Sequence, residues 1–217
     1  MTAPYWSLPY LVSAVPILMI LTRTTQPATG AAQRSRLCYK SSLLFILAWE
    51  AFDLVALYLP PDQQLASNIL TRLVFFCVSM VVGLFALSSI YLQGSPEVYE
   101  YLVAASTPIL AVCVNLLDPF TTVFGPYGWG GDINNPFLRY LWLAVLLVVL
   151  AWALMRLYML RQRATDSAVR TRLNYFLVGY LFATVSGTFV YLLADFGLEL
   201  SVVAVGFSLA IAAPAFA

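Results

Sequence analysis

The chain has 217 residues, of which 62% are hydrophobic and only 10% are charged, and its mean hydropathy is +0.86. Soluble domains carry about 45–50% apolar and about 25% charged residues, and a chain of this length cannot hide so much apolar surface in one soluble core. The composition therefore predicts a protein embedded in a lipid bilayer. A formal net charge of +1 gives no reason to expect nucleic acid as a partner.

Seven stretches are apolar over enough residues to cross a membrane, since a spanning helix needs about 20 mostly apolar residues. In chain order they are Tyr5–Leu21, Leu43–Leu59, Ile69–Leu92, Tyr99–Leu117, Phe137–Leu160, Leu173–Ala194 and Leu198–Ala217. The sequence thus predicts an all-α integral membrane protein in which residues 1–217 form a single bundle of seven transmembrane helices. No basic residue precedes the first stretch, so we interpret it as a retained helix rather than a signal peptide.

Basic residues predict the orientation, because short cytoplasmic loops carry an excess of lysine and arginine. Nine of the eleven basic residues lie in or beside the first and fifth connections, which seven spans place on the same side. They are Arg23, Arg34, Arg36, Lys40, Arg156, Arg161, Arg163, Arg170 and Arg172. We therefore expect a multi-pass protein of a bacterial inner membrane, with its N-terminus outside and its C-terminus in the cytoplasm.

Two predicted connections are longer than the others. Residues 22–42 are polar and basic and are expected to lie along the cytoplasmic headgroups, where anionic lipid favours each basic residue by about 1 kcal/mol. Residues 119–136 contain FGPYGWGGDINNP, and this content of glycine, proline and asparagine predicts a chain of turns. The aromatic rings of the same segment favour a position at the outer interface.

Charged and amide side chains inside the predicted spans are the candidates for a site. Glu50 and Asp53 share one face of the second span, where a charge costs roughly 2.5–3.5 kcal/mol unless it is paired or protonated. Arg72 lies at nearly the depth of Asp53, so we predict an Asp53–Arg72 pair. Asn115 and Asp118 close the fourth span. These residues are candidates either for a ligand or proton site or for polar contacts that fix the register of the helices.

Small residues at a spacing of four predict close helix packing in lipid. They lie on the sixth and seventh spans and are Gly179, Ala183, Gly187, Ala204, Ser208 and Ala212. We expect these two helices to pack against each other, with an interface between subunits as the alternative.

Catalytic and cofactor chemistry has few candidate residues in this sequence. Histidine is absent, and Cys38, Cys77 and Cys113 are far apart, so we expect neither a metal site nor a disulfide framework. The single lysine, Lys40, lies in a predicted cytoplasmic loop and cannot form a retinal Schiff base in the seventh span. We expect no enzymatic activity and no bound cofactor.

Taken in order, the spans resemble the N-terminal seven-helix sensor region of bacterial histidine kinases and related signalling proteins. The resemblance covers nearly the whole chain and is carried by LAWEAFDLVALYL, GLFALSSIYL, VNLLDP, FGPYGWGGDINNPF and RTRLNYFLVGYLFATVSG. In that family the fourth span often ends in Asn followed three residues later by His, whereas these positions are Asn115 and Asp118 in this chain. The resemblance implies a non-enzymatic input module that takes a small or lipophilic ligand and signals to a partner protein or to a second copy.

Two other classes of function stay open at this point. The seventh predicted span ends at Ala217, where a family member with an output domain would continue, so we expect either a sensor region of a longer chain or a stand-alone relative. A chain that ends at the membrane face without cofactor ligands also fits a non-catalytic accessory subunit of a large bacterial membrane complex, respiratory or photosynthetic. The third alternative is a small proton-coupled transporter that uses the carboxylates of Glu50 and Asp53.

Overall fold

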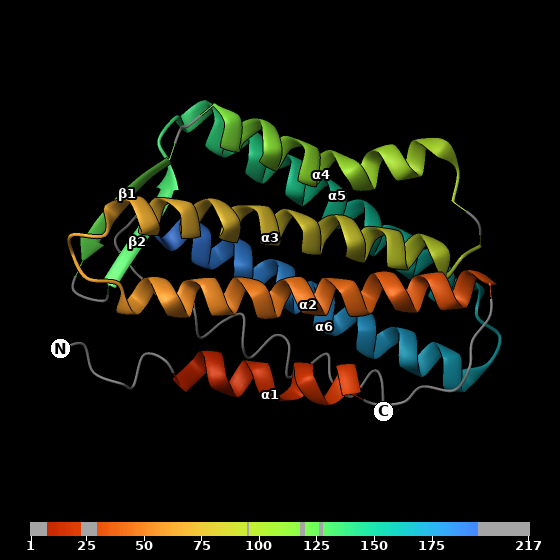
Figure 1. Ribbon diagram of the computed structural model, residues 1–217. Coiled ribbons are helices and arrows are strands. Elements are labelled where there is room, and N and C mark those ends of the chain that lie inside the picture. The colour runs from red at the N-terminus through yellow and green to blue at the C-terminus, as the bar shows by residue number, and fades with distance from the viewer. Residues whose placement is uncertain (1–7, 23–29, 95, 118–119, 126–127, 195–217) are drawn as a thin grey trace. The chain divides into compact units, whose positions relative to one another are not determined.

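The computed structural model describes residues 8–22, 30–94, 96–117, 120–125 and 128–194 (Figure 1). These residues form six helices and one two-stranded antiparallel sheet. In chain order the elements are α1 (Leu8–Thr22), α2 (Gly30–Tyr58), α3 (Gln64–Tyr91), α4 (Val98–Leu116), β1 (Phe120–Gly125), β2 (Gly128–Ile133), α5 (Pro136–Arg163) and α6 (Ser167–Ala194).

Four of these helices, α2 to α5, are long and apolar enough to cross a membrane. This agrees with a mostly helical membrane protein, but it does not establish seven spans. Helix α1 has 15 residues, fewer than the roughly 17 that a span needs. The predicted span over residues 198–217 lies outside the described residues. Four consecutive crossings return a chain to its starting side, so Arg34 and Arg163 face the same side if α2 to α5 all cross.

Several helices extend beyond the apolar segments that predicted them. Helix α2 begins at Gly30, so the segment expected to run as a loop along the headgroups is helical from that residue onward. Helix α3 begins at Gln64 and α6 at Ser167, each earlier than hydropathy indicates. Hydropathy locates the part of a helix that lies in hydrocarbon, whereas backbone hydrogen bonds continue through polar turns at its ends.

The described residues between 30 and 149 belong to one compact unit, which holds α2, α3, α4, the hairpin and the first half of α5. Within this unit α3 contacts α2 and α4, and the hairpin lies at the end where α3 begins (Figure 1). At the opposite end Ser35 Oγ donates to the backbone oxygen of Ser88 at 2.8 Å, and Ser88 Oγ donates to the backbone oxygen of Ser35 at 2.9 Å. These two reciprocal bonds hold α2 and α3 in register.

Helices α3 and α4 approach closely at Gly83. A Cβ at this position would lie 2.6 Å from the backbone oxygen of Ala104 and 3.1 Å from Thr107 Oγ1. Thr107 Oγ1 donates across the contact to the backbone oxygen of Ser79 at 2.9 Å. Pro108 has no N–H to donate to Ala104, so that carbonyl oxygen is free of its usual intrahelical bond where it faces the glycine. Close packing through a small residue therefore occurs between α3 and α4, where it had not been predicted.

The segment between α4 and α5 forms a β-hairpin, so the prediction of a chain of turns over residues 119–136 is wrong. Phe120 pairs with Ile133 and Gly125 with Gly128. Phe120 and Thr122 are buried, whereas the next residue, Val123, is exposed. This alternation is typical of a strand that packs on one face. The aromatic and β-branched residues of FTTVF favour a strand, and this local signal outweighs the surrounding glycines.

Helix α5 has a well-formed N-cap that supports a first stability prediction. The Oδ1 atom of Asn135 accepts the backbone N–H groups of Phe137 at 3.0 Å and Leu138 at 3.4 Å, and Pro136 occupies the first helical position. We expect Asn135→Ala to lower the free energy of unfolding by about 1 kcal/mol. Denaturant titration in detergent micelles measures this change. The neighbouring Asn134→Ala, at an exposed position, is the control, and an equal loss in both variants would contradict the capping role.

The described residues between 8 and 22 and between 150 and 194 belong to a second unit. Its α5–α6 connection is held by Arg161, whose Nε donates to Asn174 Oδ1 at 2.6 Å, and by Asp166, whose Oδ1 accepts the backbone N–H of Ala168 at 2.8 Å. Gly179 is buried on α6. For the other five small residues predicted for helix packing the described part of the chain gives no burial, and their role stays a prediction: Ala183, Gly187, Ala204, Ser208 and Ala212.

Candidate functional site

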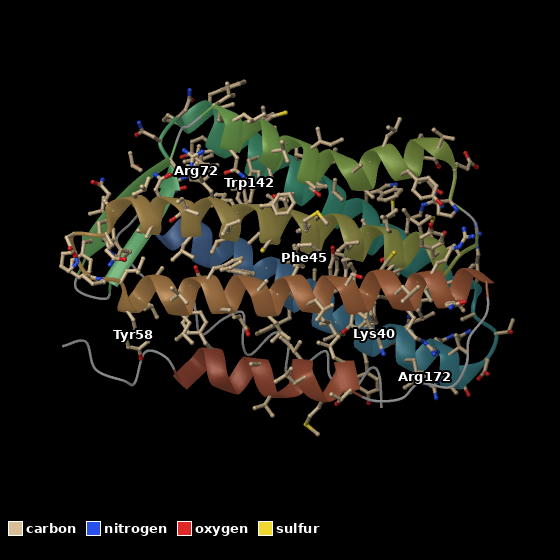
Figure 2. All side chains as sticks on the ribbon, in the orientation of Figure 1. Lys40, Phe45, Tyr58, Arg72, Trp142 and Arg172 are labelled. Carbon is tan, nitrogen blue, oxygen red and sulfur yellow. The ribbon has the colours of Figure 1, made fainter. Side chains whose placement is uncertain are left out.

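The candidate site is built around Arg72, on the first half of α3 (Figure 2). Arg72 Nε donates to Oδ1 of Asn68, one turn earlier on the same helix, at 2.7 Å. Asn68 Nδ2 in turn donates to the backbone oxygen of Phe120 at 3.4 Å. The guanidinium plane is therefore oriented by a side chain that is itself bonded to the hairpin.

Arg72 also reaches α4 and β1. Its Nη1 donates to the backbone oxygen of Asn115, one of the last carbonyls of α4, and these carbonyls have no partner within their own helix. A cation at the C-terminal end of a helix is also favoured by the helix dipole. The Cζ atom lies 5.4 Å from the centre of the Phe120 ring, within the range of a cation–π interaction. One arginine thus joins α3, the end of α4 and the start of the hairpin.

An aromatic column continues from Phe120 into the interior of the unit. The ring centres of Phe120 and Phe75 are 5.0 Å apart, and those of Phe75 and Trp142 are 4.7 Å apart. Trp142, on α5, donates from Nε1 to Ser79 Oγ at 2.9 Å, and Ser79 Oγ donates to the backbone oxygen of Phe75 at 2.9 Å. The hairpin, α3 and α5 therefore share one set of contacts that begins at Arg72.

Three polar side-chain atoms around this region are buried and have no hydrogen-bond partner in the described part of the chain. They are Ser67 Oγ, Asn115 Oδ1 and Thr122 Oγ1. Ser67 precedes Asn68 on α3, and Thr122 lies on the same face of β1 as Phe120. Since more than about 90% of buried polar groups are hydrogen-bonded, these atoms leave capacity for a polar group that comes from outside the chain.

The structure brings together two of the five predicted polar residues, Arg72 and Asn115. The contacts described for Arg72 lie on α3, α4 and β1, and the expected pair with Asp53 is not among them. The indole of Trp49, one turn earlier on α2, is the hydrogen-bonding neighbour of Asp53. Glu50 is buried on α2, and Asp118 lies outside the described residues.

Among the residues of this region that were not predicted are Asn68, Ser79, Phe120 and Trp142. Asn68 sits one turn before Arg72, and that spacing of four could have indicated it. The other three lie in apolar or turn-rich segments, where nothing in the sequence distinguishes them from neighbouring core or interface residues. Within the described ranges no group of three His, Cys, Asp or Glu side chains is placed to hold a metal ion.

Comparison with protein-family models, with curated proteins and with solved structures finds no match to this chain.

The arrangement around Arg72 supports a second prediction. Lysine keeps the charge but not the planar fork with which arginine reaches Asn68 and Asn115 at the same time. We expect Arg72→Lys to lower the free energy of unfolding by about 1.5–3 kcal/mol, the range for losing a hydrogen bond from a charged group. Denaturant titration in micelles measures it. Arg139→Lys is the control, because Arg139 forms a part-exposed ion pair with Asp132 at 3.0 Å, and such pairs contribute about 0–1 kcal/mol.

Proposed function

We propose that the chain is a non-enzymatic sensor module of a membrane, which binds a small or lipophilic ligand beside Arg72 and passes a signal to a partner protein. The observation that carries this proposal is the position of Arg72. This arginine lies within the apolar helix α3 and connects α3 with α4 and with the hairpin. Ionisable groups inside membrane helices are costly, and they commonly mark functional sites. The resemblance to the sensor regions of histidine kinases supports the same class of function.

The surroundings of Arg72 favour a ligand over a purely structural contact. Ser67, Asn115 and Thr122 each keep a buried polar atom without a partner in the described residues, and a ligand headgroup can bond to such atoms. The ring of Phe120 contacts both Arg72 and Phe75, so a ligand that displaces the hairpin also changes the contacts of α3. This is the coupling that an input module requires.

Ligand binding is tested by thermal unfolding of the purified chain in micelles with three probes of equal chain length: octanoate, octanol and octylamine. We expect octanoate to raise the midpoint most, because its carboxylate is attracted to Arg72, and we expect Arg72→Gln to abolish this rise. Arg139→Gln is the matched control at the same end of the unit. Equal shifts in the wild type and in Arg72→Gln for every probe that binds would remove Arg72 from the site. Glu50→Gln, measured in parallel, decides whether that buried carboxylate takes part.

Signal transfer is tested by purifying the tagged chain in mild detergent. A sensor module should be recovered with one partner protein, or with a second copy, in fixed stoichiometry. A lone monomer at all protein concentrations would contradict the proposal. Recovery with the several subunits of an electron-transfer or photosynthetic complex would favour the accessory-subunit alternative instead.

A further inference from the structure

A second cluster lies at the end of the first unit that is opposite the hairpin. Here α2, α3 and α4 contribute Arg34, Tyr91 and Tyr101. The Cζ atom of Arg34 lies 6.0 Å from the centre of the Tyr91 ring. The hydroxyl oxygens of Tyr91 and Tyr101 are 2.8 Å apart, and the two rings meet edge to face with their centres 6.3 Å apart. One guanidinium and two phenols from three successive helices thus meet at one place.

This cluster has donors available for a ligand. Two hydroxyl groups that share one hydrogen bond leave one phenolic proton for a further acceptor. The interaction described for Arg34 is with the face of Tyr91, which occupies none of the five N–H groups of the guanidinium. Arg34 and Tyr101 are both exposed, so a molecule in the surroundings can reach them.

The acidic groups described at this end are Glu97 and Glu100, at the start of α4. Glu100 is buried, and its Oε2 accepts the backbone N–H of Glu97 at 2.9 Å, so its carboxylate faces the start of its own helix. Glu97 is exposed beside the helix start. The charge that faces Tyr91 directly is therefore the cation of Arg34.

We propose that Arg34, Tyr91 and Tyr101 form a binding site for the phosphate of an anionic phospholipid headgroup. Guanidinium binds phosphate oxygens through two parallel hydrogen bonds, and tyrosine favours the headgroup level, where its ring is in apolar surroundings and its hydroxyl in polar ones. Leu37 on α2 and Leu102 on α4 lie close to the cluster in sequence, and they are 57% and 65% exposed. Exposed leucines of this kind can contact the acyl chains of a bound lipid. A free phosphate ion would use only the polar part of this surface. The proposal does not depend on the sensor function.

Native mass spectrometry of the full chain in micelles tests this site, with dioleoylphosphatidylglycerol and dioleoylphosphatidylcholine supplied in equal amounts. We expect the wild type to retain phosphatidylglycerol about five-fold better than phosphatidylcholine. This ratio corresponds to the roughly 1 kcal/mol by which an anionic headgroup favours one basic residue. Arg34→Gln should bring the ratio close to one. The double variant Tyr91→Phe with Tyr101→Phe keeps both rings and should lower the ratio in part. Arg163→Gln removes the same charge from an exposed arginine at the end of α5 and should leave the ratio unchanged.

Three results would overturn the proposal. They are the absence of a preference in the wild type, an equal loss of preference in Arg163→Gln, and displacement of the lipid by millimolar inorganic phosphate, which would indicate a soluble ligand. Thermal unfolding checks that each variant is folded. If Arg34→Gln does not fold, Arg34→Lys replaces it, because lysine keeps the charge but lacks the bidentate fork and should therefore still lower the ratio.

Discussion

Replacing Gly83 with alanine is expected to lower the free energy of unfolding by about 1–2 kcal/mol, because overpacking against a backbone atom costs about 2–3 kcal/mol and the helix propensity of alanine returns roughly 1 kcal/mol. The added Cβ would lie 2.6 Å from the backbone oxygen of Ala104, and a backbone atom cannot rotate away as a side chain can. Helix α4 must shift instead, which strains the bond from Thr107 to Ser79. This cost outweighs the roughly 1 kcal/mol by which alanine exceeds glycine in helix propensity. Gly83→Leu should prevent native packing of α3 on α4 altogether.

The control for this effect is Gly130→Ala. A Cβ at Gly130 would meet no atom within 4 Å, so the change should stay within about 0.5 kcal/mol, as for an ordinary surface substitution. Denaturant titration in micelles, followed by circular dichroism, compares the two variants. A Gly83→Ala protein as stable as the wild type would show that α3 and α4 do not approach so closely.

Truncating Trp142 should have a still larger effect, a loss of about 3–5 kcal/mol for Trp142→Ala. Its side chain is only 4% exposed and packs on Phe75 with ring centres 4.7 Å apart. Trp142→Phe keeps much of this packing and loses the hydrogen bond to Ser79, for which about 1 kcal/mol is typical between membrane helices. Ser79 Oγ still donates to the backbone oxygen of Phe75, so no buried hydroxyl is left without a partner.

The same titration compares these variants with Phe137→Ala on the same helix. Phe137 is 72% exposed, so truncating it removes little packing within the chain. If Trp142→Ala costs no more than Phe137→Ala, the aromatic column is not a packed interior. If Trp142→Phe costs as much as Trp142→Ala, the hydrogen bond rather than the ring dominates.

Hydropathy predicted the positions of α2 to α5 because apolarity over about 20 residues is a local property of the sequence. Arg72 and Asn115 stand out in the sequence as polar residues inside apolar spans, and in the structure Arg72 contacts the backbone oxygen of Asn115. The predicted pair of Arg72 with Asp53 is not among the contacts described for Arg72 and stays a prediction. Counting residues gives the depth of a side chain in a helix, but α3 has α2 on one flank and α4 on another, and only the tertiary fold determines which flank Arg72 faces.

The second strand of the hairpin, GWGGDI, could not be predicted from the same information, because it contains three glycines and such composition is typical of turns. What makes it a strand is its partner β1 and the surface of α3 beneath it, where a Cβ on Gly131 would collide with Thr71. Contacts distant in sequence therefore decide this element. The count of membrane spans and the packing of Ala204, Ser208 and Ala212 stay predictions, because those residues lie outside the described part of the chain.

The reciprocal bonds between Ser35 and Ser88 have a mechanical consequence. Sliding α2 along α3 by one turn, about 5.4 Å, would break both bonds at once and leave two hydroxyls and two carbonyls without these partners in a buried place. Axial translation between the two helices is thus opposed at this end of the unit. Tilting about the serine pair is opposed at the other end, because β2 contacts both helices there and Trp129 Nε1 donates to the backbone oxygen of Pro60 at 3.0 Å. The two helices are therefore held at both ends, which keeps Arg72 and the hairpin at a fixed height along α2.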